Sequence, residues 1–414
     1  MLKQISYENW KSFHEATLYI DPLTVMIGTN ASGKSNALDG LTFLNRVTLG
    51  KEIATALDGD STIAAIRGGV EWAALKPNTQ FTLATIVQGE DDLTEYLYTI
   101  TIELRPRVQL QAESLTRHTY DKKTPKKLTP TPIFLTDETT EDSLRVSLFN
   151  GKGVRRVTRT FRRSTTILSQ IQGQTLREDV NNGIKAVIGA LQHIFILDPV
   201  PSLMRTFSAL ADNLQNNAAN IAGVLAALPA GEKQQVEATL SHYVTHLPER
   251  DIQRVWAEPV GRFQTDAMLY CEELWLPDQP PTTIDSRGMS DGTLRFLAIL
   301  TALLTRPKES LLVIEEIDNG LHPSRAALLL RMLHEIGQAR GIDILLTTHN
   351  PALLDALHPE MMPFVVVTHR DPETGESQLT LLEDLANLPK LLSFGSLGGI
   401  STKGLIERSL SSDQ

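Results

Sequence analysis

The chain has 414 residues, of which 41% are hydrophobic and 21% are charged, and its formal net charge is −10. This length allows a large core in two or three lobes, and the overall acidity argues against indiscriminate coating of nucleic acid. The single cysteine, Cys271, excludes an internal disulfide and suits a reducing cytosol. The N-terminus lacks the apolar core of a signal peptide, and the longest apolar run, Phe296 to Leu304, is too short for a membrane span. We therefore expect a cytoplasmic protein that does not enter a membrane.

The chain is predicted to begin with short strands followed by a helix. Residues 5–13, 16–20 and 23–27 have strand-like patterns, and residues 33–57 have a helical pattern. Further strands are expected downstream, the first two of them as a hairpin across Gly89. They are residues 81–88, 96–104, 144–149, 154–161, 252–256 and 267–274.

The remaining segments divide the chain into three predicted parts. Residues 117–143 are rich in Lys, Thr, Pro and acidic residues, which predicts an exposed excursion. Residues 176–247 are largely helical in pattern without a sustained apolar heptad, which predicts a compact helical insertion. Helices and strands alternate from 285 to 367. The predicted parts are an N-terminal lobe with a β subdomain (1–175), the helical insertion (176–250) and a C-terminal lobe (251–414).

The most specific motif is a phosphate-binding loop at residues 28–35. Its sequence GTNASGKS fits G-x-x-x-x-G-K-[ST] at every fixed position and lies between a predicted strand and a predicted helix. The backbone N–H groups and the positive end of the helix dipole would face the phosphates of ATP. Lys34 would reach the β- and γ-phosphates, and the Ser35 hydroxyl would bind Mg²⁺. The expected nucleotide-binding residues of this stretch are Asn30, Ala31, Ser32, Gly33, Lys34, Ser35 and Asn36.

Two predicted strands downstream end in groups that suit phosphate chemistry. Residues 311–314 are followed by Glu315 and Glu316, and residues 344–348 are followed by His349. We assign Glu315 to the Mg²⁺ shell and Glu316 to the orientation of the attacking water, with His349 contacting the γ-phosphate or positioning that water. Each motif alone has an ordinary interpretation: a histidine at a strand end often supports the fold, and paired glutamates often begin a solvated loop.

Two further motifs complete the series. Residues 166–170 read as an apolar strand that ends in Gln170, which could bind Mg²⁺ and report the state of the nucleotide. Ser290 and Gly292 stand where a helix is expected to begin, and a helix N-terminus binds anions. The joint order of these motifs after a phosphate loop is much more specific than any one of them.

In this order the motifs resemble an ABC-type ATPase of the SMC/RecF-like branch. The resemblance is to small AAA-family predicted ATPases related to OLD-type and PARIS-type anti-phage defence ATPases, without a TOPRIM domain. It rests on four stretches of the sequence. They are Asn9 to Phe13 before the phosphate loop, Asn216 to Ala222, Ser290 to Arg295, and Glu315 to Pro323. Glu315 replaces the Asp of most ABC proteins, Ile317 replaces the usual Pro, and His322 occupies the place of the D-loop Asp.

The resemblance implies an α/β ABC-ATPase head, with a mixed sheet flanked by helices, an antiparallel β lobe and a helical insertion. In such families two heads pair head to tail and enclose two ATP molecules. Ser290 and Gly292 of one subunit would then cap the γ-phosphate held by the other, in a homodimer or a higher homo-oligomer. Lys11 is implied to bind nucleotide. Arg67 resembles an arginine loop that reaches nucleotide or DNA, although it could equally be an ordinary surface arginine.

Two functions remain open beyond ATP hydrolysis. The first is a sensor or regulatory ATPase in bacterial anti-phage defence that controls a separately encoded effector, either a toxin or a nuclease. The second is a repair or chromosome-maintenance ATPase that binds double-stranded DNA through a basic stretch. That stretch contains Lys152, Arg155, Arg156, Arg159, Arg162 and Arg163, and it could also be a solvated strand face. A transporter subunit and a scaffold that only binds ATP are weaker alternatives.

Overall fold

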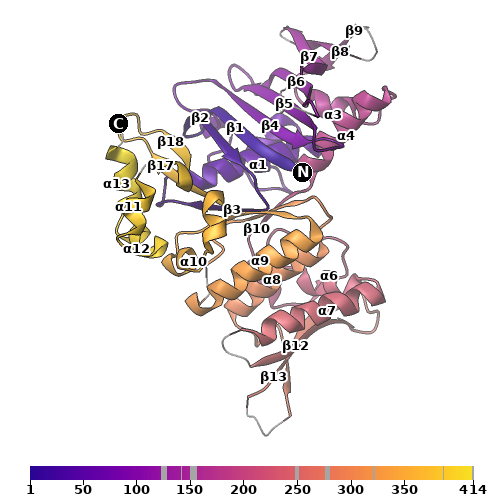
Figure 1. Ribbon diagram of the computed structural model, residues 1–414. Helices are drawn as coiled ribbons and strands as arrows, with labels where there is room; N and C mark the ends of the chain where they lie inside the picture. The colour runs from indigo at the N-terminus through magenta and orange to yellow at the C-terminus, as the bar shows by residue number, and fades with distance from the viewer. Residues whose placement is uncertain are drawn as a thin grey trace. The chain divides into compact units, whose positions relative to one another are not determined.

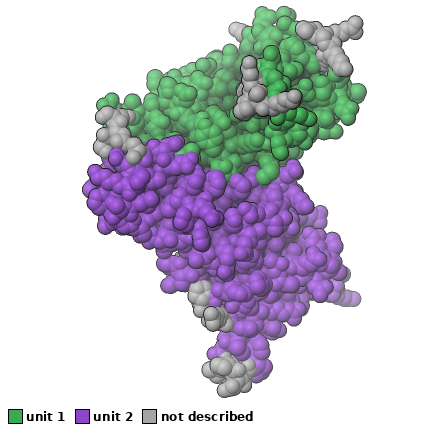
Figure 2. Space-filling view, in the orientation of Figure 1, with its two compact units in different colours: residues 1–21, 27–194, 366–381 green, residues 22–26, 195–365, 382–414 purple. Residues whose placement is uncertain are grey.

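The computed structural model describes most of the chain as two compact units. The described residues are 1–122, 128–140, 142–149, 156–247, 251–275, 280–319, 322–385 and 387–412. The first unit consists of residues 1–21, 27–194 and 366–381, and the second consists of residues 22–26, 195–365 and 382–414. Figure 2 shows the first unit in green and the second in purple. The chain therefore passes between the units several times.

The first unit is built on an eight-stranded antiparallel sheet (Figure 1). The strand order is β2-β1-β4-β5-β6-β7-β8-β9. The strands are β1 Leu2–Trp10, β2 Phe13–Tyr19, β4 Gln80–Gln88, β5 Thr94–Glu103, β6 Gln109–Thr119, β7 Thr131–Thr139, β8 Ser143–Phe149 and β9 Arg156–Arg162. Alternate residues of β5 are buried, as expected where helices cover one face of a sheet.

Helices and a hairpin complete the first unit. They are α1 Lys34–Thr48, α2 Ile53–Asp58, η1 Val70–Trp72, α3 Ile167–Ile171, α4 Glu178–Gln192, and the antiparallel pair β17 Val365–Arg370 and β18 Ser377–Leu381. Two buried aromatic residues of β1 fix the start of α1. The Tyr7 hydroxyl donates to the carbonyl oxygen of Ala37 at 3.0 Å, and Trp10 Nε1 donates to that of Asn36 at 2.8 Å. The antiparallel sheet thus positions the helix that follows the phosphate loop.

The second unit contains short buried strands and long helices. β10 Ile194–Leu197, β15 Leu311–Ile314, β16 Asp343–Thr347 and β3 Leu23–Ile27 are neighbours in that order. β16 runs parallel to both β15 and β3. Every residue of β15, β16 and β3 is buried, which is characteristic of parallel strands covered on both faces. α8 Asp291–Thr305 and α9 Ala326–Arg340 are the two long helices near these strands.

A second, smaller sheet lies in the same unit. Its strands are β11 Ser208–Ala209, β13 Asp266–Glu273, β12 Ile252–Val260 and β14 Thr282–Asp285. The unit also contains the 16-residue helix α7 Ala230–Thr245. Its shorter elements are α5 Pro201–Met204, α6 Ile221–Ala227, η2 Pro323–Arg325, α10 Pro351–Asp355, η3 Pro359–Phe364, η4 Leu382–Asp384, α11 Leu388–Leu392, α12 Leu397–Thr402 and α13 Leu405–Ser412. The hydroxyl of Ser241 on α7 accepts from Val255 N of β12 at 3.0 Å, so α7 packs directly on this sheet.

The predicted α/β class with an antiparallel β lobe is confirmed. The three N-terminal strands, the hairpin of β4 and β5, and the alternation of helices and strands after 285 are observed as expected. Residues 117–143 differ from the predicted excursion, because β6 continues to Thr119 and β7 covers Thr131–Thr139; residues 123–127 and 141 lie outside the described parts. The helices expected as one insertion are divided, since α4 belongs to the first unit and α5, α6 and α7 to the second.

The predicted strand at residues 166–170 is wrong, because this stretch forms the helix α3. Thr166 caps the helix by accepting a hydrogen bond from Ser169 N at 3.1 Å. The buried carboxylate of Glu113 on β6 accepts from the N–H groups of Ile167 and Leu168, which are two of the unpaired donors at the helix start. A tertiary contact with a residue far away in sequence therefore favours a helix where the local apolar pattern indicated a strand.

Among the described helices, none has both the length and the apolar character that crossing a bilayer requires.

Candidate nucleotide-binding site

The phosphate loop joins the buried strand β3 to the helix α1, as the motif predicts. Its two fixed glycines have backbone angles that other residues rarely adopt, with φ of 145° at Gly28 and 123° at Gly33. A Cβ atom on Gly28 would lie 2.2 Å from the carbonyl oxygen of Thr368. On Gly33 it would lie 2.5 Å from the Ser377 hydroxyl oxygen. The hairpin of β17 and β18 therefore packs against the loop so closely that both positions require glycine.

The loop carries the groups that a triphosphate needs. Lys34 Nζ donates to the carbonyl oxygens of Gly28 at 2.6 Å and Thr29 at 3.0 Å, so the ammonium lies over the loop itself. The hydroxyl of Ser32 is buried and has no hydrogen-bond partner among the described residues. α1 has no side-chain cap and no acidic residue in its first turn, which leaves its N-terminal dipole uncompensated. These features fit an anionic ligand.

Lys11 and Arg67, both predicted to bind nucleotide, converge on Asp39 of α1. Lys11 Nζ lies 2.6 Å from Asp39 Oδ2, and Arg67 Nη1 lies 3.3 Å from Asp39 Oδ1. Arg67 also donates to the carbonyl oxygen of Ser35 at 3.4 Å, and its own carbonyl accepts from Lys11. Burial lowers the pKa of the Lys11 ammonium, and the Asp39 carboxylate partly offsets this effect. Lys11 is thus an internal partner of Asp39, whereas half of the Arg67 side chain is exposed beside the loop.

The structure places Gln170 on α3 in the first unit, where its amide is held by the chain that precedes it. Its Oε1 accepts from Arg162 N at 3.1 Å, and its Nε2 donates to the carbonyl oxygens of Arg162 at 3.0 Å and Thr165 at 3.2 Å. Within the described residues, this amide makes no hydrogen bond to the phosphate loop. A nucleotide-sensing role for Gln170 would require these local bonds to be exchanged.

The carboxylates and the histidine follow strands whose ends coincide. Ile314 of β15 pairs with Leu346 of β16, and Thr347 of β16 pairs with Met26 of β3. Thr348 N donates to the Met26 carbonyl at 3.1 Å, two residues before the first glycine of the loop. Glu315, Glu316 and His349 are therefore all attached to the carboxyl edge from which the loop itself departs, which is where parallel α/β sheets bind ligands.

Glu316 has an unusual backbone. Its φ is 47°, a left-handed conformation that is strained for a glutamate and tends to occur at functional sites. The conformation is held by two bonds to one residue, because Glu316 N donates to Thr347 Oγ1 at 2.8 Å and Ile317 N donates to the Thr347 carbonyl at 3.1 Å. The Thr348 hydroxyl in turn donates to Asp318. The side chains of Glu316 and His349 are exposed.

Ser290 and Gly292 lie at the start of α8, as predicted. Ser290 is the N-cap and its hydroxyl accepts from Thr293 N at 3.1 Å. The loop before the helix is held by Arg205, which sequence reasoning did not identify. Its guanidinium donates to the carbonyl oxygens of Ser286 at 3.2 Å, Arg287 at 3.0 Å and Met289 at 2.6 Å, and pairs with Asp291. One arginine thus fixes the loop that presents the helix N-terminus.

The predicted site residues are divided between the two units. The phosphate loop, Lys11, Arg67 and Gln170 belong to the first, whereas Glu315, Glu316, His349, Ser290 and Gly292 belong to the second. The supporting residues Asp39, Thr347 and Arg205 were missed. Their partners are backbone atoms or distant side chains, and no local spacing in the sequence marks them.

Comparisons with known proteins concern the family and the fold of the chain. The family model described as "AAA domain, putative AbiEii toxin, Type IV TA system" matches residues 23–355. No curated protein matches the chain. A solved structure of an SMC head bound to the C-terminal winged-helix domain of ScpA aligns with 12% identity and a TM-score of 0.51, covering 92% of this chain and 97% of that chain. This alignment shows the fold of an SMC head.

Two further SMC heads are similar at lower scores. The head domain from Thermotoga maritima has 12% identity and a TM-score of 0.45, over 92% of this chain and 98% of that chain. The head with an extended coiled coil, bound to a ScpA domain derived from Pyrococcus furiosus, has 10% identity and a TM-score of 0.48, over 95% and 99%.

Proposed function

The chain belongs to this AAA-domain family, and from that premise we propose that it binds ATP with Mg²⁺ and hydrolyses it to ADP and phosphate. The observation that carries the proposal is the phosphate loop, in which two glycines are sterically required and the Lys34 ammonium already lies among the loop carbonyls. A triphosphate would accept hydrogen bonds from the N–H groups at the start of α1 and replace the carbonyls as the partner of Lys34.

Each remaining residue has a distinct role in this proposal. Ser35 and Glu315 would hold the magnesium ion, and Gln170 would join them if its local hydrogen bonds opened. The ion, when bound, neutralises charge that develops on the phosphates. Glu316, held in a strained backbone by Thr347, orients the attacking water, and His349 contacts the γ-phosphate. Ser290 and Gly292 contact the γ-phosphate bound by a second copy, in a head-to-tail homodimer.

The direct test separates binding from hydrolysis. Lys34→Ala should lose ATP affinity, whereas Glu316→Gln should keep ATP affinity and lose turnover, because only the water-orienting group is removed. Equilibrium dialysis with ATP and a phosphate-release assay measure the two quantities. Glu373→Gln, an exposed glutamate on the turn between β17 and β18, is the matched control and should behave as wild type. Wild-type turnover in Glu316→Gln would remove the assigned role.

For the biological role, we propose a regulatory ATPase of anti-phage defence that controls a separately encoded effector, either a toxin or a nuclease. The family description refers to a toxin and a TA system, which supports a protein that works with a partner. The complex should be purified from the native operon in the Glu316→Gln background, with and without ATP. A second polypeptide in the particle is the expected result. An ATPase that contains no second polypeptide in either state would contradict it.

The alternative, a repair or chromosome-maintenance ATPase that binds double-stranded DNA, rests on fewer residues than the sequence indicated. Arg163 is buried and donates to the carbonyl oxygens of Leu110 at 2.9 Å and Thr140 at 2.9 Å, so it supports the fold. Arg156 forms an ion pair with Asp137 at 2.8 Å. Lys152 and Arg155 lie outside the described residues. What supports the alternative is the exposure of Arg159 and Arg162 on β9, the edge strand of the large sheet.

The DNA alternative has its own test. If both arginines contact phosphates, replacing Arg159 and Arg162 by Ala should weaken duplex binding. It should also lower the slope of log affinity against log salt by about one for each contact. Fluorescence anisotropy over a salt series measures both. An unchanged affinity and slope would eliminate this surface.

A further inference from the structure

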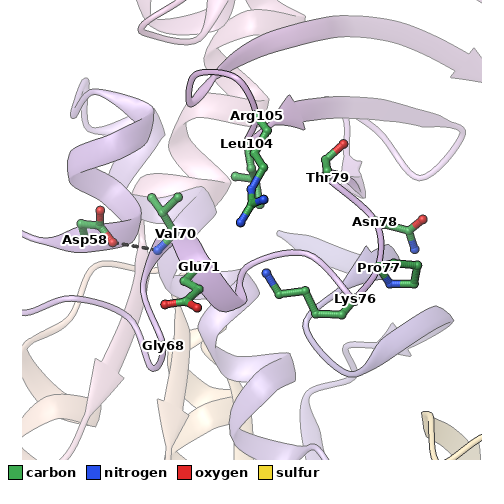
Figure 3. Close-up of a pocket in the computed structure, with 10 residues that line it drawn as sticks. All are labelled: Asp58, Gly68, Val70, Glu71, Lys76, Pro77, Asn78, Thr79, Leu104 and Arg105. Atoms are coloured by element: carbon green, nitrogen blue, oxygen red, sulfur yellow. Dashed lines mark hydrogen bonds between the residues drawn. The ribbon is translucent and has the colours of Figure 1, made fainter.

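The first unit contains a pocket that none of the predicted motifs explains. It has a volume of about 640 Å³. Its lining includes Asp58, Gly68, Val70, Glu71, Lys76 and Arg105. Figure 3 shows that the lining residues come from the end of α2, from η1 and its preceding turn, from the chain before β4 and from the end of β5. The volume is in the range of sites for metabolite-sized ligands.

Two cations extend into the pocket from different walls. In Figure 3 the Lys76 ammonium and the Arg105 guanidinium both point into the hollow. Among the described residues, neither side chain forms a hydrogen bond or an ion pair, although two carboxylates line the same pocket. The Asp58 carboxylate is already occupied, because it accepts from Val70 N at 2.7 Å. The two cations are thus arranged to bind one anionic group between them.

An exposed aromatic ring lies beside one of the two cations, Lys76. The Trp72 side chain is 57% exposed, and Lys76 Nζ lies 5.5 Å from the centre of its ring. The ring packs on Gly68, where a Cβ atom would come within 2.7 Å of Trp72. An exposed indole beside a cation is a surface on which nucleobases stack. The neighbourhood therefore offers partners for a base as well as for a phosphate.

From these contacts we propose that this pocket binds a nucleoside phosphate at a site separate from the phosphate loop. Lys76 and Arg105 hold the phosphate, and Glu71 accepts a hydrogen bond from a ribose hydroxyl. The base stacks at the rim on Trp72. A bare phosphate would leave most of the pocket empty and Glu71 without a partner, which is why the proposed ligand is a nucleoside phosphate.

The pocket is connected by the chain to the phosphate loop. Gly68, which lines it, follows directly after Arg67, and Arg67 contacts the Ser35 carbonyl at 3.4 Å and Asp39 at 3.3 Å. A ligand that orders residues 68–71 therefore also restrains Arg67 beside the loop.

The test uses AMP as the probe, with inorganic phosphate and a short single-stranded oligodeoxynucleotide as the other arms. Calorimetry should show AMP binding that weakens at least about tenfold when Lys76 and Arg105 are both replaced by Ala, since each charged hydrogen bond contributes substantially. The matched control replaces two exposed lysines of the same unit, Lys122 and Lys185, and should retain the affinity. Lys34→Ala should also retain it, because that residue belongs to the other site.

Photolabelling with 8-azidoadenosine monophosphate provides a second readout that does not depend on folding of the variants. The label is expected on the peptide that contains Trp72 in the wild-type chain. Labelling of the phosphate loop instead, or loss of AMP binding in Lys34→Ala, would overturn the proposal. Absence of AMP binding would do the same, and binding of the oligonucleotide alone would assign the pocket to a polynucleotide and refute the small ligand.

Discussion

Arg370, at the end of β17, donates a hydrogen bond from Nε to the carbonyl oxygen of Ala31 in the phosphate loop at 2.9 Å. Its Nη1 donates to the Gly375 carbonyl at 2.6 Å, so the side chain links the loop to the β17–β18 turn. Ala31 has a φ of 64°, which is unfavourable without such support. We expect Arg370→Ala to raise the Kd for ATP about three- to tenfold, the effect of one lost hydrogen bond.

Fluorescence titration with an ATP analogue measures this change. Arg370→Lys keeps one donor and should give an intermediate affinity, because lysine cannot reach both carbonyls in the fork geometry of arginine. Arg262→Ala, an exposed arginine of the second unit, is the control. If Arg370→Ala binds ATP as tightly as wild type, the contact does not shape the loop.

Asp39 is predicted to be the residue of this site that matters most for stability. Its side chain and that of its partner Lys11 are only 8% and 5% exposed. Asp39→Asn would leave the Lys11 ammonium buried beside a neutral amide, and such a loss typically costs about 3 kcal/mol of unfolding free energy. Combining Asp39→Asn with Lys11→Met should recover part of the loss, because the buried charge is then absent.

Urea denaturation of the two single variants and the double variant measures these differences. The exposed ion pair between Lys51 and Asp60 supplies the control, because Lys51→Ala should leave the denaturation midpoint unchanged. Additive effects of Asp39→Asn and Lys11→Met would show that the pair is not coupled and would contradict the prediction.

Arg205→Ala should affect association of the heads more than ATP binding. The guanidinium holds three carbonyls of the loop before α8, and the loop presents Ser290 and Gly292. If these residues cap the nucleotide of a second copy, a loosened loop should weaken ATP-dependent pairing of the Glu316→Gln protein about tenfold. Sedimentation velocity gives the dimer affinity, and nucleotide titration at low protein concentration gives the ATP affinity of the monomer.

The control for this experiment is again Arg262→Ala in the same background. Equal losses of ATP affinity and of pairing in Arg205→Ala would indicate general damage to the second unit. Unchanged pairing would show that the loop does not take part in the interface.

Glu113 gives the fold a pH dependence. Burial raises the pKa of its carboxyl group from an ordinary 4.5 to about 7, although hydrogen bonds from Leu168 N, Ile167 N and the Tyr98 hydroxyl oppose the shift. The folded state therefore holds this proton more tightly than the unfolded state. The stabilisation that this bound proton gives the folded state is fully present below pH 4.5 and is lost as the pH rises to about 7. The loss over that interval is about 3 kcal/mol.

The measurement compares the unfolding free energy of wild type and Glu113→Gln between pH 4.5 and 8. The variant should lack the part of the pH dependence that comes from Glu113. The difference in unfolding free energy between wild type and Glu113→Gln should therefore shrink as the pH rises. Glu113→Gln should also be less stable than wild type at low pH, because its amide cannot accept from both N–H groups of α3. Parallel pH profiles of the two proteins would show that Glu113 titrates normally.

The phosphate loop and the strands around it could be predicted from the sequence alone. The spacing of Gly28, Gly33, Lys34 and Ser35 is a local property, and the apolar runs before Gly28, Glu315 and Thr348 specify buried strands wherever they lie in the fold. The start of α8 at Asp291 was likewise predictable, because Ser290 is a local cap.

Other features were decided only by tertiary structure. Residues 166–170 have an apolar pattern that fits a strand, but the Glu113 carboxylate on β6 satisfies the first N–H groups of a helix there. The basic stretch read as one positive surface, yet the fold buries Arg163 and pairs Arg156 with Asp137. In both cases the residue that makes the decisive contact lies on another strand or turn of the sheet and is distant in sequence.

The phosphate loop could be recognised from the sequence, because its phosphate-binding groups occur at fixed short spacings along the chain. The tertiary structure decided which charged residues remain available to a ligand. Lys11 forms a buried ion pair with Asp39, whereas the side chains of Lys76 and Arg105 are directed into a pocket. The physical reason is that pairing and burial of a charge depend on partners brought together from distant strands and turns, and those distances are not encoded in any local pattern.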